Sequence, residues 1–171
     1  MTEDPRDNAD LLERRASQVL AQIKARGWTI ATAESCTGGL IASLLTDIQG
    51  LSGQFERGFV TYSNEAKSEL LGIPLDRIEH HGAVSAETAR AMAAGALAGS
   101  RADIVVAVTG FADEGDEPGL VFLAAQQRGE RAVIQECHFG AQGRAKVRRK
   151  SAEAALGLMA RLAERQEEQA A

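Results

Sequence analysis

The sequence predicts a single layered α/β domain with a mixed β-sheet and helices on both faces of that sheet. The chain has 171 residues, which fits one domain. Short β-favouring runs alternate with segments whose apolar residues recur at helical spacing, as in layered α/β proteins. Near the end of the chain two strand-like runs are separated only by a turn, which predicts a hairpin and therefore a sheet that is not purely parallel.

The first helix and strand lead into a turn that carries a serine. Residues 7–26 place apolar side chains at helical spacing and end before Gly27, a favourable helix stop. Residues 28–32 are short and β-favouring, and residues 37–45 return to helical spacing. Ser35 is therefore expected in a strand-to-helix turn.

The second strand is followed at once by a helix that carries a lysine. Residues 58–62 are expected to form the strand. Either Ser63 or Asn64 can cap a helix over residues 65–71, because both side chains accept hydrogen bonds from free backbone N–H groups. Lys67 then lies near the first turn of that helix.

The middle of the chain contributes a short helix, a longer helix and a buried strand. Pro74 opens the short helical piece, and Ser85 caps an Ala-rich helix over residues 86–98. Residues 104–108 are almost continuously apolar, as expected of a strand that is buried on both faces. This strand leads directly into Thr109 and Gly110.

The last third of the chain is expected to form the hairpin and a closing helix. The two strands span residues 119–126 and 131–139, and the helix, basic in its first half, spans residues 141–164. The expected organisation is an N-terminal tail over residues 1–10, one domain over residues 11–164 and a frayed tail over residues 165–171.

Composition narrows the class of protein. Charged residues make up 25% of the chain and hydrophobic residues 44%, as in globular proteins, but one Tyr, one Trp and five Phe leave few side chains for stacking on bases. The net charge of −5 gives no electrostatic footprint for nucleic acid or an anionic membrane surface. Neither a signal peptide nor a membrane span is recognisable. Cys36 and Cys137 match no zinc or redox spacing, so a reducing cytoplasm is the expected location.

Three strand ends carry the side chains that could perform chemistry. Ligands of open α/β sheets bind beyond the carboxyl ends of strands. Ser35 lies at the first such end, where Gly38 and Gly39 allow close approach of the backbone and the next helix is expected to offer free N–H groups. Lys67 lies at the second, where the helix dipole and partial burial should lower its pKa. Thr109-Gly110 at the third could stabilise an oxyanion.

Each of these residues, taken singly, has a more ordinary explanation. Ser35 could be a turn or cap residue, and Lys67 a solvated surface lysine. Tyr62 could lie at the edge of the core, and Cys36 could be a small buried hydrophobic residue. The residue types alone therefore leave the catalytic interpretation open.

The combination of motifs is specific, and it resembles the CinA C-terminal domain family. The matching stretches, in the family's order and spacing, are AESCTGG at residues 33–39, GFVTYSNEAK at 58–67, LGIP at 71–74 and HGAVS at 81–85. The resemblance extends over residues 11–162. It implies a stand-alone form of the domain, and members of the family include amidohydrolases that convert nicotinamide mononucleotide to nicotinate mononucleotide and ammonia.

The resemblance also implies roles for individual residues. Ser35 would be the nucleophile, Lys67 with Tyr62 would accept and relay its proton, and no metal or cofactor would take part. The expected substrate-binding residues are Cys36, Thr37, Gly38, Asn64, Thr109 and Gly110. Backbone groups near Cys36 or Gly110 could hold the oxyanion. A homodimer with a small nucleotide substrate is the expected assembly.

One loop departs from the family pattern. After Thr109-Gly110 the family usually continues with a glycine-rich loop and a Lys-Pro-Val-Gly-Thr motif, whereas residues 111–119 here are shorter and lack that lysine. They contain four carboxylates, Asp113, Glu114, Asp116 and Glu117. Near a bound phosphate monoester, each unpaired carboxylate would weaken binding by charge repulsion unless solvent screened it.

Two other interpretations follow from this departure. The chain could be a degenerate relative that keeps the fold as a ligand-binding or protein-interaction module. Alternatively, it could be an amidase that keeps Ser35 and Lys67 but acts on another small amide. Turnover of nicotinamide mononucleotide distinguishes the three interpretations.

Overall fold

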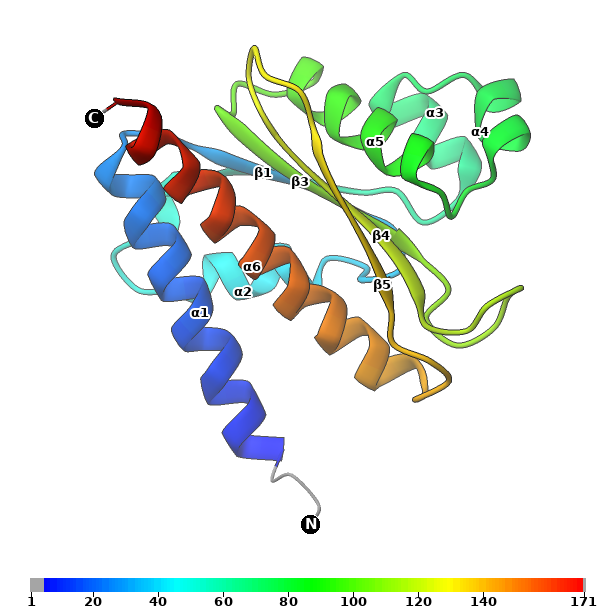
Figure 1. Cartoon of the computed structure of the whole chain (residues 1–171), viewed down its shortest axis with the longest axis horizontal. Helices are drawn as coiled ribbons and strands as arrows, with labels where there is room; N and C mark the ends of the chain where they lie inside the picture. The colour runs from blue at the N-terminus through cyan, green and yellow to red at the C-terminus, as the bar shows by residue number, and fades with distance from the viewer. Residues whose placement is uncertain (1–4, 171) are drawn as a thin grey trace.

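The computed structural model describes residues 5–170, with side chains described for residues 11–164 (Figure 1). Its helices are α1 (Pro5–Ala25), α2 (Leu40–Thr46), α3 (Asn64–Leu71), α4 (Leu75–His81), α5 (Ala86–Ala98) and α6 (Arg144–Ala170), with a 3₁₀ turn at Ser52–Gln54. Its strands are β1 (Ile30–Glu34), β2 (Phe55–Val60), β3 (Ile104–Gly110), β4 (Leu120–Gln127) and β5 (Val133–His138). None of the described helices is long and apolar enough to cross a membrane.

The sheet is mixed, as predicted. Its strand order is β2-β1-β3-β4-β5. The pairs β1–β2 and β1–β3 are parallel, whereas β3–β4 and β4–β5 are antiparallel. The expected terminal hairpin is the β4–β5 pair.

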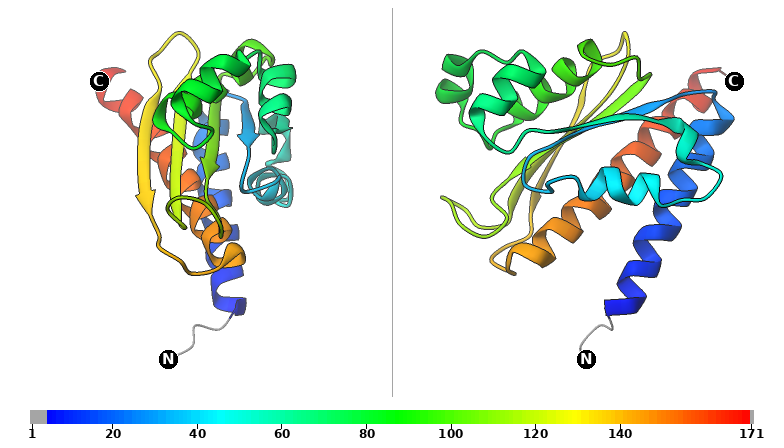
Figure 2. Two further views of the ribbon diagram at one scale, coloured as in Figure 1. Left: turned by 90° about the vertical axis from the view of Figure 1, so that its right-hand side faces the viewer. Right: turned by 180° about the vertical axis from the view of Figure 1, so that it is seen from behind.

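Helices cover both faces of the sheet, as Figures 1 and 2 show. On one face α2 and α6 contact the strands and α1 packs against these two helices; on the other face α5 contacts the strands, and α3 and α4 pack beside it. The strand β3 serves both cores because its side chains alternate: Ile104, Val106 and Val108 join the first core, and Val105 and Ala107 join the second. A strand buried on both sides explains the continuous apolar run seen in the sequence.

The order of the strands places a binding site at one end of the sheet. After β1 the chain passes through α2 to β2 on one side, and it then returns through α3, α4 and α5 to β3 on the other side of β1. The carboxyl ends of β1 and β3 therefore flank a topological switch point, which is where open α/β sheets bind ligands.

Several element boundaries differ from the predictions. The helix α2 begins at Leu40 rather than at residue 37, because Gly38 and Gly39 have φ angles of 58° and 91°, which no right-handed helix accommodates. Similarly, α6 begins at Arg144, after Gly143 with a φ angle of 84°, and continues to Ala170 beyond the expected end.

The termini were predicted as tails over residues 1–10 and 165–171. The helix α1 begins at Pro5, within the first of these segments. Residues 1–4 and 171 lie outside the part of the chain that the structure describes. The proposed domain boundaries stay predictions.

Capping and close packing fix the helix that carries Lys67. The hydroxyl of Ser63 accepts a hydrogen bond from the Ala66 N–H at 3.0 Å, which makes Ser63 the N-cap of α3. At the other end, a Cβ atom on Gly95 of α5 would lie 2.2 Å from the carbonyl oxygen of Leu71. Only glycine at this position lets α5 approach α3 so closely, and α3 is thereby held against the body of the domain.

Candidate active site

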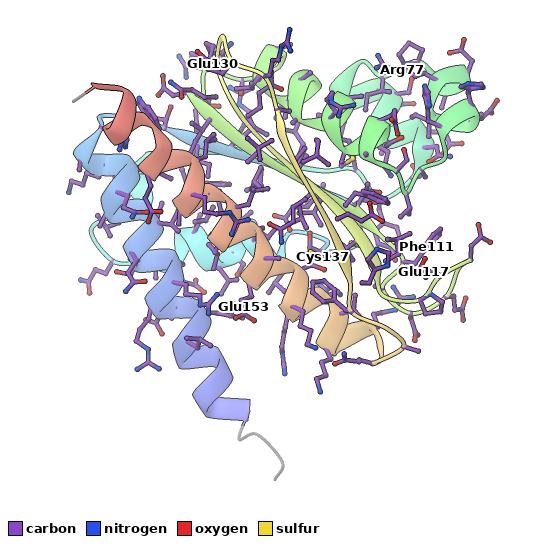
Figure 3. The ribbon with its side chains drawn as sticks, viewed as in Figure 1. Arg77, Phe111, Glu117, Glu130, Cys137 and Glu153 are labelled. Carbon is purple, nitrogen blue, oxygen red and sulfur yellow. The ribbon has the colours of Figure 1, made fainter. Side chains whose placement is uncertain are left out.

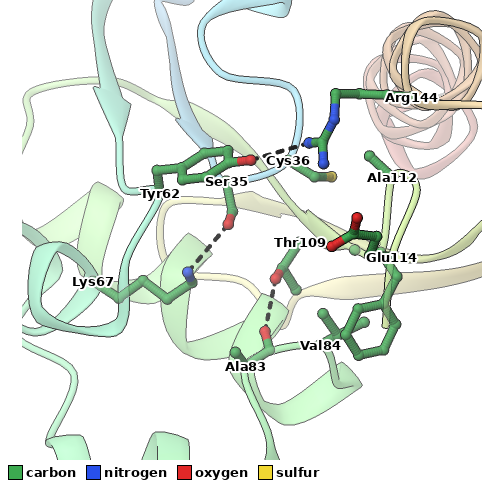
Figure 4. Close-up of a pocket in the computed structure, with 12 residues that line it drawn as sticks. Ser35, Cys36, Tyr62, Lys67, Ala83, Val84, Thr109, Ala112, Glu114 and Arg144 are labelled. Atoms are coloured by element: carbon green, nitrogen blue, oxygen red, sulfur yellow. Dashed lines mark hydrogen bonds between the residues drawn. The ribbon is translucent and has the colours of Figure 1, made fainter. Parts of the chain in front are cut away.

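Ser35 and Lys67 meet at the switch point (Figure 4). The Lys67 Nζ lies 3.1 Å from the Ser35 Oγ and 3.1 Å from the carbonyl oxygen of Thr61. Ser35 follows β1 directly, and its N–H donates to the Val108 carbonyl of β3 at 2.9 Å. Lys67 is 1% exposed and Ser35 is 8% exposed. The two residues, 32 positions apart in sequence, therefore form one buried pair. This agrees with the prediction that the ends of their strands lie close together.

Burial alters the chemistry of the lysine. Desolvation lowers the pKa of Lys67 below its ordinary value, and weaker contributions from Cys36 and Glu65 act in the opposite direction. The ammonium form donates to both Ser35 and Thr61. Once Lys67 is neutral, its lone pair can accept the serine hydroxyl proton across the same 3.1 Å contact. The arrangement is therefore suited to a lysine base that activates a serine.

A buried carboxylate fixes the turn around the serine. Glu34 is fully buried, and its two oxygens accept hydrogen bonds from the backbone N–H groups of Gly39, Ile41 and Ala42 at 3.1, 3.0 and 2.8 Å. The expectation that the start of α2 offers free N–H groups to a ligand is therefore wrong, because the chain's own carboxylate occupies them. The stabiliser of a reaction intermediate must lie elsewhere.

Two backbone N–H groups remain as candidates for that role. Cys36 follows Ser35, and its N–H donates to no carbonyl in the described part of the chain. In β3 the Phe111 N–H donates to Leu120 of β4, so the alternation of the strand turns the Gly110 N–H toward the end of β1. A Cβ atom at Gly110 would lie 2.6 Å from Val121 Cγ2, so no side chain fits there.

Tyr62 lies at the mouth of the site rather than beside the lysine. Its side chain is 63% exposed, and its hydroxyl accepts a hydrogen bond from Arg144 Nη1 at 3.1 Å (Figure 4). Among residues 11–164 no hydrogen bond joins Tyr62 to Ser35 or Lys67. The structure thus brings the predicted serine and lysine together and leaves the predicted tyrosine apart from them.

The expected binding residues divide into two groups. Cys36, Thr109 and Gly110 line the cavity, and the Thr109 hydroxyl donates to the Ala83 carbonyl at 2.7 Å. Thr37, Gly38 and Asn64 are not part of the cavity wall. Their binding roles stay predictions without support from the shape of the cavity.

The cysteine next to Ser35 is buried in surroundings that disfavour its thiolate form. Burial raises the pKa of the Cys36 thiol to about 12, and the charge of Glu34 acts in the same direction. Since the thiolate is the reactive form, Cys36 contributes its backbone and its shape to the cavity rather than a second nucleophile.

The cavity has a volume of about 220 Å³ and includes residues that were not among the expected catalytic and binding residues, although the acidic loop that carries Glu114 was expected near the ligand. These residues are Ala83, Val84, Phe111, Ala112, Glu114 and Arg144. Arg144 begins α6 and belongs to the basic stretch noted in the sequence, and Glu114 belongs to the unusual acidic loop. Within the described residues, no cluster of three His, Cys, Asp or Glu side chains is placed to hold a metal ion.

The carboxylates of the acidic loop do not share one orientation. Glu117 pairs with His138 Nδ1 at 2.6 Å, and the other ring nitrogen lies 2.9 Å from Glu136. Hydrogen bonds to Glu117 and Glu136 raise the pKa of His138. Glu114, by contrast, lines the cavity. Of the loop's carboxylates, Glu114 is therefore the one placed to meet a ligand.

Comparisons with known proteins identify similar sequences and similar structures. The sequence profile of the CinA C-terminal domain matches residues 12–163. Nicotinamide-nucleotide amidohydrolase PncC of Escherichia coli K12 is 48% identical over 135 residues, which cover 75% of this chain and 82% of that protein. The crystal structure of a competence/damage-inducible protein from Agrobacterium tumefaciens superposes with a TM-score of 0.86 at 41% identity, covering 95% of this chain and 99% of the other. A Klebsiella pneumoniae structure, the competence damage-inducible protein A, gives 0.83 at 34% identity and covers 91% and 97%.

Proposed function

We propose, from the premise that this chain belongs to the CinA C-terminal domain family, that it is a nicotinamide-nucleotide amidohydrolase. It hydrolyses the carboxamide of nicotinamide mononucleotide to give nicotinate mononucleotide and ammonia. The observation that carries the proposal is the buried contact of 3.1 Å between Lys67 Nζ and Ser35 Oγ. A relative that carries the same activity in its name supports the choice of substrate.

The reaction begins with attack by Ser35. Neutral Lys67 accepts the hydroxyl proton while the Ser35 Oγ forms a bond to the carboxamide carbon. The negative charge that develops on the carbonyl oxygen is stabilised by the N–H groups of Cys36 and Gly110. The tetrahedral intermediate then breaks its C–N bond, and Lys67 returns the proton to the leaving nitrogen, which departs as ammonia.

Water completes the cycle. Lys67, neutral again, accepts a proton from a water molecule that attacks the acyl carbon of the Ser35 ester. Collapse of the second tetrahedral intermediate releases the carboxylate product and restores the serine hydroxyl. Both steps need a base of lowered pKa at the same place, which the burial of Lys67 supplies.

Arg144 and Tyr62 act at the mouth of the cavity. The Arg144 guanidinium can bind a phosphate monoester through paired N–H donors. Phosphate binding there competes with the hydrogen bond that Arg144 donates to Tyr62. We propose that Tyr62, once released, turns toward Lys67 and helps to relay its proton.

Ammonia release from purified protein tests the proposed function. Turnover of nicotinamide mononucleotide, with formation of nicotinate mononucleotide confirmed by chromatography, is the expected result. Binding of the nucleotide without turnover would instead identify a degenerate binding module. Neither binding nor turnover, in protein that is folded by circular dichroism, would contradict the assigned substrate.

A second candidate function is favoured by Glu114 in the cavity wall. A carboxylate at this position suits an unphosphorylated amide better than it suits a phosphate monoester. Parallel ammonia-release assays on nicotinamide riboside and nicotinamide mononucleotide distinguish the two functions by their ratio of kcat/KM.

We further propose that the protein acts as a homodimer in the cytoplasm. The family resemblance supports the dimer, and the free, buried cysteines Cys36 and Cys137 are consistent with a reducing compartment. Size-exclusion chromatography with light scattering measures the oligomeric state directly.

A further inference from the structure

The mouth of the cavity presents one positive and one negative side chain from distant parts of the chain. Arg144 comes from the start of α6, and Glu114 comes from the loop between β3 and β4. Figure 4 shows both side chains around the space that leads to Ser35. Both residues are exposed, so their charges are available to a ligand.

Arg144 has a partner in the chain, whereas Glu114 has none that the structure describes. The Arg144 guanidinium donates to the Tyr62 hydroxyl. Further along the same loop, Glu117 points away from the cavity and pairs with His138. Among residues 11–164 no salt bridge or hydrogen bond engages the Glu114 carboxylate. A cavity that takes a phosphate monoester should not keep an unpaired carboxylate in its wall unless another part of the ligand is cationic.

Nicotinamide mononucleotide has such a part. Its pyridinium ring carries a permanent positive charge on the ring nitrogen, and the carboxamide is attached to the same ring. The phosphate lies at the other end of the molecule, beyond the ribose. The substrate is therefore a zwitterion whose positive end contains the reacting group.

The size of the cavity limits how much of the substrate it can enclose. Pockets that enclose a whole ligand of drug size occupy roughly 300–1,000 Å³. The cavity above Ser35 has about 220 Å³, so it can enclose the ring while the ribose phosphate lies outside. Glu114 and Arg144 both line this cavity, and the ring charge is the part of the ligand that a carboxylate attracts, which leaves Arg144 for the phosphate.

We propose that Glu114 is a specificity-determining residue that recognises the positive charge of the substrate's pyridinium ring, whereas Arg144 recognises the substrate's phosphate. The inference rests on the proposed function and deepens it. It predicts that the protein selects nucleotides with an oxidised, cationic nicotinamide ring over those with a neutral dihydro ring.

Three ligands distinguish the contribution of the ring charge to binding from that of the phosphate charge. Nicotinamide mononucleotide carries both, its dihydro form carries only the phosphate, and nicotinamide riboside carries only the ring charge. Binding is measured by calorimetry at low salt on a Ser35→Ala parent, in which turnover is blocked. Adding Glu114→Gln should raise Kd for nicotinamide mononucleotide and for the riboside by roughly two- to fivefold, the size of an exposed ion pair, and leave the dihydro form unchanged. Adding Arg144→Gln should weaken both phosphorylated ligands and leave the riboside unchanged.

A matched control uses the same chemical change elsewhere. Glu130 lies in the turn after β4, at the opposite end of that strand from the acidic loop (Figure 3). Glu130→Gln should change no Kd. High salt should reduce the effect of Glu114→Gln, because screening weakens exposed charge pairs.

Other outcomes overturn the inference. If Glu114→Gln tightens both phosphorylated ligands and leaves the riboside unchanged, the carboxylate faces the phosphate and repels it. If it changes none of the three, the carboxylate faces solvent. Both results would leave the proposed function standing. Failure of the Ser35→Ala parent to bind nicotinamide mononucleotide at all would overturn the proposed function together with the inference.

Discussion

The floor and the mouth of the cavity are built on different principles. At the floor, Ser35, Lys67 and Glu34 are buried, and each makes hydrogen bonds to the backbone or to one another. At the mouth, Tyr62 and Arg144 are exposed and share a single hydrogen bond. Fixed geometry and altered pKa values require burial, whereas charge recognition works through exposed groups that substrate can displace. Substitutions at the floor should therefore have far larger effects than those at the mouth.

The largest effect is expected at Ser35, the proposed nucleophile. Ser35→Ala should lower kcat by at least about 10³-fold, because no other group of the site can form the acyl intermediate. The fold should persist, since Ser35 Oγ caps no helix in the described part of the chain. Ammonia release measures the first effect and chemical denaturation the second. Ser43→Ala, on the exposed side of α2, is the control, and an active Ser35→Ala enzyme would remove the serine from the mechanism.

The proposed role of Lys67 as the base should be visible in the pH dependence of kcat/KM. The pKa of Lys67 is lowered by burial, so kcat/KM should rise as pH increases through a value below the ordinary 10.5 and then level off once the amine is neutral. Lys67→Arg should abolish this limb and most of the activity, because arginine stays protonated. An active arginine variant, or activity that falls as Lys67 loses its proton, would mean that the positive charge of Lys67 matters and not its lone pair. A rise centred near 10.5 would mean that burial does not lower the pKa of Lys67.

The comparison also shows what sequence can and cannot predict. The pairing of Ser35 with Lys67 follows from topology, because the turns and helix starts that follow neighbouring parallel strands meet at one edge of the sheet. Arg144 could not be placed in this way, since the terminal hairpin and Gly143 decide where α6 begins and no local periodicity reports that position.

Glu34 illustrates a different failure of sequence reasoning. A carboxylate at the end of a strand looks like a solvated residue, and its partners lie five to eight residues further along. The positive φ angles of Gly38 and Gly39 fold the chain back so that these N–H groups reach it. Sequence therefore predicted a free helix terminus where the fold supplies its own anion.

The role of Glu34 can be tested by a neutral isostere. Glu34→Gln retains the shape but offers one acceptor oxygen to three N–H groups, and its amide hydrogens oppose them. Loss of charge-assisted hydrogen bonds predicts a free energy of unfolding lower by about 2–3 kcal/mol, with a lower kcat because the turn holding Ser35 loosens. Urea denaturation measures the change. Glu69→Gln, on the exposed surface of α3, should have almost no effect on stability.

The smallest effect is expected from substitutions in the Glu117–His138 pair, which connects the acidic loop to the sheet. Both ring nitrogens of His138 face carboxylates, Glu117 on the loop and Glu136 on β5, and only the protonated imidazolium can donate to both. The pKa of His138 is accordingly raised above 6.5. The stabilisation is therefore fully present below the unfolded pKa near 6.5 and is lost as pH rises through the higher folded value.

Because of the His138–Glu117 pair, ligand binding at the mouth of the cavity should depend on pH. NMR titration should give His138 a pKa above 6.5 that falls in a Glu117→Gln variant, by no more than the modest amount that an exposed ion pair allows. Since the same loop carries Glu114, loosening it above that pKa should weaken binding of ligands with a cationic ring and leave the reaction of Ser35 intact. Compared with the parent enzyme at one pH below the His138 pKa, Glu117→Gln should therefore raise KM and leave kcat unchanged. A His138 pKa at its ordinary value, or a change in kcat alone, would show that the loop is held by its glycines and Phe111 rather than by the ion pair.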